Sequence, residues 1–194
     1  MLLFLYCRGT EDEEQKSVAS ERKFIVYESC LQSLLSVCLI CQTACTVTVR
    51  NCVGTMVTLK STCTNGHQRL WSSQPSNGNM PWGNIICAAG ILFTGCNPYK
   101  VFNYFRNIGV DFIAPRTYNL LQKLYIIPSV SKVWEKHQIA ILHNLQQKQL
   151  VLGGDGRCDS PGYSAKYGSY SLMELESNKV IDVQLVQVTI YPIY

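Results

Sequence analysis

The sequence predicts an α+β chain, and three observations support that prediction. Two segments rich in Val and Thr, with alternating polarity, lie between a pair of cysteines and a pair made of one cysteine and one histidine. Three apolar segments with helical spacing follow, and Pro or Gly marks the turns between them. The last part of the chain returns to alternation. We therefore expect a cysteine-rich β-hairpin module, a helical middle and a final group of three β-strands.

Composition narrows the class of protein. Hydrophobic residues make up 47% of the chain and charged residues 15%, which is typical of a globular protein. The net charge of +4 permits nucleic-acid binding without requiring it. The opening MLLFLYC is too short for a secretion signal, and no segment has the length of a membrane span. We expect a protein of a reducing compartment, neither secreted nor membrane-bound, in which clustered cysteines are metal ligands or buried thiols.

The predicted elements fall into four segments of the chain. Residues 1–22 form a disordered leader of mixed charge, 23–83 a cysteine-rich module, 84–148 a helical region, and 149–194 a group of strands. In the module, the spacing of apolar residues predicts a helix over 24–38, followed by strands at 46–50 and 54–62. The stretch NCVG, residues 51–54, is the predicted hairpin turn.

The module carries a Cys-x2-Cys pair and a Cys-x3-His pair on either side of its hairpin. The four side chains are those of Cys38, Cys41, Cys63 and His67. Zinc prefers four tetrahedral N and S ligands, and two short knuckles joined by a hairpin supply them. The sequence therefore predicts a structural zinc site in a zinc-ribbon-like module.

Alternatives remain open at this cluster. Cys45 and Cys52 lie close enough in the sequence to compete as ligands. The cysteines are also consistent with buried thiols beside an exposed His67, or with disulfides. A zinc site with four protein ligands is a staple of the fold and catalyses nothing.

In the helical region, Pro and Gly mark short turns between successive helices, as in a helix-turn-helix arrangement. Helices are expected at 84–93, at 97–109 with an Asn cap and Gly109 as the stop, at 114–128 ending at Pro128, and at 131–149. Tyr118, Leu121, Leu124 and Tyr125 form the expected buried side of the third helix, and Trp134, Ile141, Leu142 and Leu145 that of the fourth. The third helix presents candidate DNA contacts: Arg116, Asn119, Gln122 and Lys123. The alternative is the ordinary polar face of a three-helix core.

The final segment reads as strand, loop, strand, turn and strand. Asp155 ends the first apolar strand, 149–155, and Asp159 follows in the loop. This order opens the RNase H-like fold, in which a carboxylate of the first strand binds Mg²⁺ or Mn²⁺ for phosphoryl transfer. The alternative is an aspartate that caps a turn. A complete site needs further carboxylates from later in a chain.

The stretch GDGRCDSPGYSAKYG, residues 154–168, resembles the start of the catalytic domain in Kolobok-type transposases and their domesticated relatives. The segments GTMVTLKSTCTNGHQRLWSSQP and GILFTGCNPYKVFNYFRNIG also resemble that family, so the likeness spans roughly residues 22–188. The resemblance implies a zinc-ribbon and helical DNA-binding front, followed by a DDE-type nuclease core of RNase H-like fold. It also implies DNA as a possible partner. We expect a nuclear location, or a cytoplasmic one if the protein is not imported.

In this resemblance, Asp155 matches the first catalytic carboxylate and Asp159 is a weaker candidate. The second and third carboxylates have no counterpart here, and TIYPIY departs from the family pattern. We expect a truncated transposase-derived protein with DNA-binding potential and an incomplete active site, so that Mg²⁺ or Mn²⁺ would act only in a complete domain. An incomplete sheet has an open edge, which favours pairing between copies. The alternative is a zinc-stabilised interaction module without a catalytic or nucleic-acid role.

Overall fold

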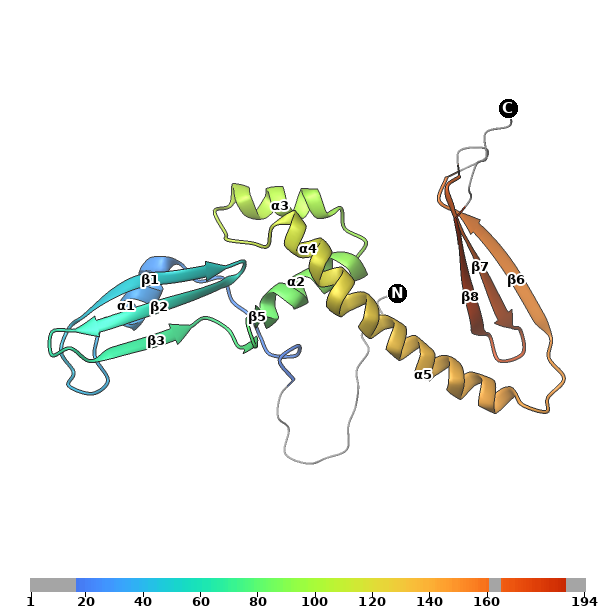
Figure 1. Cartoon of the computed structure of the whole chain (residues 1–194), viewed down its shortest axis with the longest axis horizontal. Coiled ribbons are helices and arrows are strands. Elements are labelled where there is room, and N and C mark those ends of the chain that lie inside the picture. The colour runs from blue at the N-terminus through green and yellow to red at the C-terminus, as the bar shows by residue number, and fades with distance from the viewer. Residues whose placement is uncertain (1–16, 161–164, 188–194) are drawn as a thin grey trace. The chain divides into compact units, whose positions relative to one another are not determined.

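The computed structural model describes residues 17–160 and 165–187 and confirms a mixed α+β chain (Figure 1). The chain divides into two compact units, Met1–Ile126 and Ile127–Tyr194, which are described separately. The predicted division into four segments is finer than this and stays a prediction. Most of the predicted disordered leader, residues 1–16, and the terminal TIYPIY segment lie outside the described residues.

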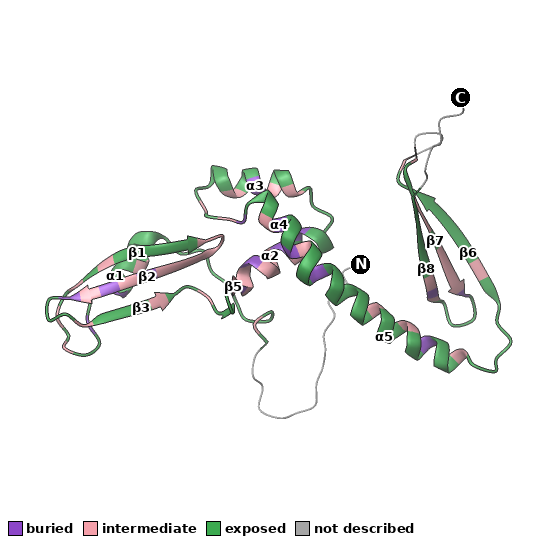
Figure 2. Cartoon of the chain, in the orientation of Figure 1, coloured by how far each residue is buried: buried purple, intermediate pink, exposed green. Residues whose placement is uncertain are grey.

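The first unit contains an antiparallel sheet in the order β1-β2-β3. Its strands are β1 (Cys45–Val53), β2 (Met56–Cys63) and β3 (Gln68–Ser72), so both predicted strands of the hairpin are present. The turn consists of Gly54 and Thr55, so it begins at the last residue of the predicted turn NCVG. Gly54 has a φ of +59°, which other residues rarely adopt. The most buried strand is the central β2, as Figure 2 shows.

The helix predicted over 24–38 is much shorter in the structure. Helix α1 spans Glu28–Leu34 and has no buried residue. Tyr27 is 78% exposed and Leu34 is 71% exposed, so the apolar side chains have no surface to pack against. A helix without a packed face gains too little to extend beyond two turns.

The helical part of the first unit begins after a small β-ladder of β4 (Ser76–Asn77) and β5 (Met80–Pro81). Its helices are α2 (Trp82–Phe93), α3 (Pro98–Asn107) and α4 (Pro115–Leu121). The predicted start of α3 is confirmed, because the Asn97 side chain accepts from the backbone N–H groups of Tyr99 and Lys100. Gly109 follows the end of α3 with a φ of +71°, as a helix stop requires.

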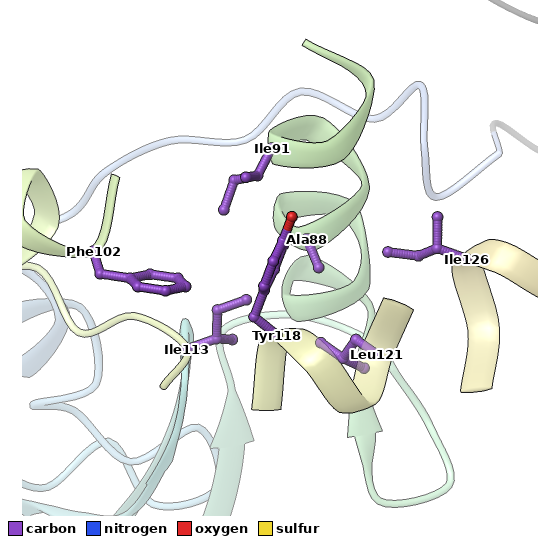
Figure 3. Close-up of a cluster of buried hydrophobic side chains, with 7 residues drawn as sticks. All are labelled: Ala88, Ile91, Phe102, Ile113, Tyr118, Leu121 and Ile126. Carbon is purple, nitrogen blue, oxygen red and sulfur yellow. The ribbon is translucent and has the colours of Figure 1, made fainter. Parts of the chain in front are cut away.

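These helices enclose the main hydrophobic core. The cluster consists of Ala88, Ile91, Phe102, Ile113, Tyr118, Leu121 and Ile126. Figure 3 shows the Tyr118 ring lying beside α2, with Phe102 and Leu121 on either side of it. The rings of Phe102 and Tyr118 meet edge to face, with centroids 5.8 Å apart.

The prediction that a helix stops at Pro128 is wrong. A π-helical turn, η1 (Gln122–Ile126), follows α4, and α5 (Ile127–Leu145) begins directly after it. Proline lacks an N–H and its ring collides with the carbonyl four residues earlier, so a wider turn in front of Pro128 relieves that conflict. The extra residue also shifts the buried face. Leu124 and Tyr125, predicted to be inside, are 53% and 38% exposed, while Ile126 is buried.

The second unit consists of α5 and a second sheet. Of the four side chains predicted to face inward on α5, only Ile141 is buried, and Leu142 is 46% exposed. The half-buried Gln138 Nε2 donates to the backbone oxygen of Ile181 at 2.9 Å and to Asp182 Oδ1 at 3.2 Å. One polar side chain thus joins α5 to the sheet, and the apolar face of α5 is only partly used.

The second sheet is an antiparallel meander in the order β6-β7-β8. Its strands are β6 (Leu152–Cys158), β7 (Tyr167–Glu174) and β8 (Lys179–Gln187), which confirms the predicted succession of strand, loop, strand, turn and strand. Strand β6 is largely exposed, however, and Asp155 lies in its middle opposite Ser171. The prediction that Asp155 ends a buried strand is therefore wrong. The three strands are consistent with many α+β folds, and an RNase H-like assignment stays a prediction.

No helix in the described parts of the chain is long and apolar enough to cross a membrane.

Candidate metal centre

Two tight backbone turns carry the Cys and His side chains. In the first, the Cys38 N–H donates to the Thr43 oxygen at 2.9 Å and the Gln42 N–H donates to the Cys38 oxygen at 2.9 Å. In the second, the Cys63 N–H donates to the His67 oxygen at 3.1 Å, and Gly66 closes the turn with a φ of +82°. Each turn therefore points two side chains in one direction, as a metal knuckle does.

The two turns bring four ligand atoms together at one end of the first sheet. The sulfur atoms of Cys38, Cys41 and Cys63 and a ring nitrogen of His67 all lie within 4.8 Å of one another. Cys41 Sγ lies 3.6 Å from Cys63 Sγ, and His67 Nδ1 lies 3.5 Å from Cys63 Sγ and 3.8 Å from Cys38 Sγ. Ligand atoms of a tetrahedral zinc site lie about 3.5–3.8 Å apart, given bonds of about 2.3 Å to sulfur and 2.0 Å to nitrogen.

The same distances decide between the alternatives for these residues. A disulfide needs its sulfurs about 2.05 Å apart, so the 3.6 Å between Cys41 and Cys63 is not a bond. His67 is half-buried and contacts two thiols, so the picture of buried thiols beside an exposed histidine is wrong. Cys38 and Cys63 are themselves buried, with 8% and 5% of their surface exposed.

Hydrogen bonds to two of the thiols lower their pKa and so favour the thiolate form. The Thr43 hydroxyl lies 3.1 Å from Cys41 Sγ, and with the Thr43 backbone it lowers the pKa of Cys41 to about 5. Burial opposes ionisation of Cys63, but backbone hydrogen bonds from His67 and Asn65 outweigh it, so the pKa of Cys63 is lowered. Metals bind thiolates rather than thiols, so both effects favour a bound cation.

The pKa of His67 shifts in the opposite direction to the pKa values of Cys41 and Cys63. Hydrogen bonds to Cys41 and then Cys63 raise the pKa of His67, because a thiolate stabilises the imidazolium form. A metal ion that binds Nδ1 must displace that proton.

The two remaining candidate ligands differ from each other. Cys52 is exposed and lies near the hairpin turn, at the other end of the ladder from Cys63, so it is not part of the cluster. Cys45 is half-buried and stands directly opposite Cys63 in the β1–β2 ladder. Burial raises the pKa of Cys45, and the charges of Cys38 and Cys63 raise it further.

The two aspartates predicted for Mg²⁺ or Mn²⁺ belong to the second unit of the chain. Asp155 is exposed in the middle of β6. Asp159 Oδ1 accepts from the Lys166 N–H at 3.1 Å and so closes a loop. Among residues 17–160 and 165–187, no group of three or more ligands other than the Cys and His cluster is suited to a metal ion. No such group of described residues includes Asp155, and its role as a ligand of Mg²⁺ or Mn²⁺ in a complete domain stays a prediction.

The candidate DNA contacts lie on α4 and the π-helical turn. Arg116, Asn119 and Lys123 are exposed, as predicted. Gln122 is half-buried and donates through Nε2 to the Tyr118 hydroxyl at 2.8 Å. Gln122 thus supports the core through Tyr118, and the prediction that it points outward is wrong.

Thr43 is a functional residue that the sequence reasoning missed. Its hydroxyl bonds to a ligand, and its backbone oxygen closes the first knuckle. The available signal was a hydroxyl residue two positions after Cys41, where Thr often bonds to a preceding group.

Comparisons with protein-family models, with curated proteins and with solved structures find no match to this chain. The function has to be argued from residues and geometry alone.

Proposed function

We propose that Cys38, Cys41, Cys63 and His67 bind one zinc ion that holds the β1–β3 sheet and its two knuckles together as a zinc-ribbon-like module. The observation that supports this most is the set of 3.5–3.8 Å separations between sulfur and nitrogen atoms. Three sulfurs and one nitrogen are a common donor set of structural zinc sites. All four positions are filled by protein, so the ion stabilises the fold and leaves no position open for a substrate.

The small core of this module supports a structural role. Its fully buried apolar side chain is Leu59 in β2, and Leu35 is 3% exposed. A core of this size contributes little stability, and small modules of this kind are commonly reinforced by a metal ion. A zinc ion bound to thiolates adds folding free energy that the core lacks, because the unfolded chain has no preformed site.

The test is a metal count on the purified full-length chain. We expect about one zinc per chain, and a chelator should lower the melting temperature. Cys63→Ser should abolish stoichiometric zinc, whereas the matched control Cys52→Ser should retain it because Cys52 is outside the cluster. A metal-free wild-type chain whose melting temperature ignores both chelator and added zinc would end the proposal.

Nucleic-acid binding is a second candidate function, and one feature of the sequence favours it. No Asp or Glu occurs between Glu28 and Asp111, a range that includes the metal centre and the first helices. The same range carries five basic side chains: Arg50, Lys60, Arg69, Lys100 and Arg106. An acid-free surface with scattered cations attracts a phosphate backbone.

The geometry of the first sheet adds to this argument. Lys60 of β2 pairs with Thr48 of β1 and Leu70 of β3. Thr58 and Thr62 lie two positions before and after Lys60, so their side chains are on the same face of the sheet. Hydroxyl and ammonium groups both donate to phosphate oxygens, and β1, β2 and β3 contain no Asp or Glu of their own. We infer that this face, with the exposed Arg116 and Lys123 of the helical part, contacts DNA phosphates.

Salt titration of duplex binding tests this second candidate. The wild-type chain should bind DNA at low salt and release it as salt rises. Lys60→Ala with Arg116→Ala should reduce the salt slope by about one for each phosphate that the variant no longer neutralises. Asn107→Ala, at an exposed position of α3 outside the candidate contacts, serves as an uncharged control. A zinc-loaded chain that retains no DNA at low salt would favour the alternative function, an interaction module with no nucleic-acid role.

An origin from a Kolobok-type transposase is a wider proposal that rests on the resemblance of residues 154–168. A nuclear location and pairing of copies through the open edge of the second sheet belong to that proposal. The edge strand β8 carries Leu185, which is 83% exposed and consistent with such pairing. Sedimentation of the wild-type chain and of Leu185→Lys tests the pairing, and a monomer in both cases would contradict it.

A further inference from the structure

We propose that Cys45 is a fifth ligand of the metal centre, which replaces His67 on the ion and converts the centre from three thiolates and one imidazole to four thiolates. This inference rests on the proposed zinc site and goes beyond it. The inference implies that the centre can exchange one of its ligands, instead of holding the ion with a fixed set of four.

The β1–β2 ladder places Cys45 beside the cluster. Cys45 pairs directly with the ligand Cys63, so the two side chains lie on the same face of the sheet. The Cβ atoms of directly opposed residues lie about 4.5–5.5 Å apart. The Cys45 N–H donates to the Ser36 oxygen at 2.7 Å, which fixes this backbone against the first knuckle.

The sulfur of Cys45 lies beside the ligands, with a side-chain hydrogen bond to Cys38, but is not one of the four clustered ligand atoms. It donates to the Thr43 oxygen at 3.9 Å, a weak interaction for a thiol, and lies outside the set of atoms within 4.8 Å of one another. Cysteine has a single side-chain torsion, and a step to the next staggered rotamer moves its sulfur by about 3 Å. A rotation of that kind directs the thiol toward Cys63 without moving the backbone.

There is space for this rotation. A cavity of about 220 Å³ is lined by Cys38, Cys45 and His67 together. Arg69 also lines the cavity, and no carboxylate does.

The exchange conserves atoms and charge. The bond from the ion to His67 Nδ1 breaks and a bond to Cys45 Sγ forms. The proton that leaves the Cys45 thiol is taken up by Nδ1 of the released His67, so the net charge of the site does not change. The ion keeps four ligands at the end of the step, and no oxidant or reductant is needed.

The test uses the full-length chain loaded with Co²⁺ in place of zinc, because the intensity of the thiolate-to-cobalt absorption reports how many thiolates are bound. The wild-type chain should show three thiolates. His67→Ala should show four, an increase in intensity of about one third. His67→Ala with Cys45→Ser should return to three thiolates and bind the ion more weakly than His67→Ala alone.

The matched control is His67→Ala with Cys52→Ser, which should keep the four-thiolate spectrum because Cys52 lies away from the centre. A His67→Ala chain that binds Co²⁺ with only three thiolates overturns the inference about Cys45 and leaves the metal site intact. A wild-type chain that binds neither Co²⁺ nor zinc overturns the proposed function itself, so the two failures are distinguishable.

Discussion

Asn84 holds Thr55 through two hydrogen bonds to one side-chain oxygen. Asn84 Oδ1 accepts from the backbone N–H of Thr55 and from its hydroxyl, each at 2.9 Å. Asn84 Nδ2 also donates to the Val53 oxygen at 2.9 Å, so a single amide of α2 replaces the backbone partners that the β1–β2 turn lacks. Asn84 is 1% exposed, which makes this junction part of the interior of the first unit.

Replacing Asn84 should therefore weaken the first unit. Asn84→Ala leaves the Thr55 N–H and the Val53 oxygen without their partner in a buried place, at a cost of about 1–3 kcal/mol. Urea unfolding of the full-length chain measures this. Asn119→Ala is the matched control, since Asn119 is exposed on α4. Equal midpoints for the two variants would show that the junction contributes nothing.

Replacing Gly54 or Gly90 by alanine should change the stability of the protein in opposite directions. Gly54 has a φ of +59°, and a Cβ there would lie 2.5 Å from Asn84 Oδ1, so Gly54→Ala should destabilise by more than about 1 kcal/mol. Gly90 lies inside α2 with no atom within 4 Å of an added Cβ, so Gly90→Ala should stabilise by up to about 1 kcal/mol. Thermal melts of both variants check the pair, and a stabilising Gly54→Ala would be incompatible with the turn.

Thr43 should control metal affinity without being a ligand. Thr43→Val removes the hydroxyl 3.1 Å from Cys41 Sγ, which raises the pKa of Cys41 back toward 9.0 and leaves less thiolate for the ion. Loss of a group that hydrogen-bonds a ligand typically weakens metal affinity by about 10–100-fold. Competition with a chromogenic chelator measures the change. Thr46→Val, an exposed threonine of β1, is the control, and matching affinities in both variants would contradict the role of Thr43.

Glu174 should make the second sheet sensitive to acid. Its buried carboxylate accepts from the Ser177 hydroxyl, from the Ser177 N–H at 2.7 Å and from the Glu176 N–H at 3.1 Å. The Ser177 side chain is the main reason that the pKa of Glu174 lies below its ordinary value of 4.5. A lowered folded-state pKa contributes stability that is complete above the unfolded-state pKa and is lost as pH falls through the folded-state pKa.

The corresponding comparison uses Glu174→Gln, which removes the charge and keeps the shape. The variant should be less stable than wild type near about pH 7, and the difference should shrink as the pH falls below the ordinary value of 4.5 and through the lowered pKa of Glu174. Urea unfolding followed over this range of pH measures the difference. Glu176→Gln, at an exposed position, controls for charge alone. A difference that stays constant with pH would contradict the role of the Glu174 carboxylate.

Elements marked by local chemistry were predictable from the sequence. The cap at Asn97 and the stop at Gly109 depend on residues within one or two turns of the helix itself, and both are confirmed. The clustering of the four candidate metal ligands was predictable for the same reason, because each knuckle spans five residues or fewer and the hairpin between them brings the knuckles together.

The features that the sequence did not predict depend on distant contacts. Asn84 lies 29 residues from Thr55, and nothing near either residue indicates their bond. The π-helical turn before Pro128 replaces an expected helix end, because proline signals a conflict without specifying how the backbone resolves it. The predicted strand 149–155 reads as buried because it contains the apolar run Leu150–Leu152, but β6 begins only at Leu152, and the described part of the second unit supplies no covering layer over Asp155.

Asp155 and Asp159 should therefore differ in their effect on stability. Asp159 Oδ1 accepts from the Lys166 N–H at 3.1 Å, so Asp159→Ala should cost about 1 kcal/mol, and Asp159→Asn should recover most of it by keeping an acceptor. Asp155 is exposed, so Asp155→Ala should change stability by less than about 0.5 kcal/mol.

Urea unfolding with and without Mg²⁺ separates the two interpretations of Asp155. We expect Mg²⁺ to leave the unfolding midpoint of the wild-type chain unchanged, because the described residues bring no group of three metal ligands to Asp155. A midpoint that rises with Mg²⁺ in the wild type but not in Asp155→Ala would instead make Asp155 a metal ligand, as the resemblance to transposases implies.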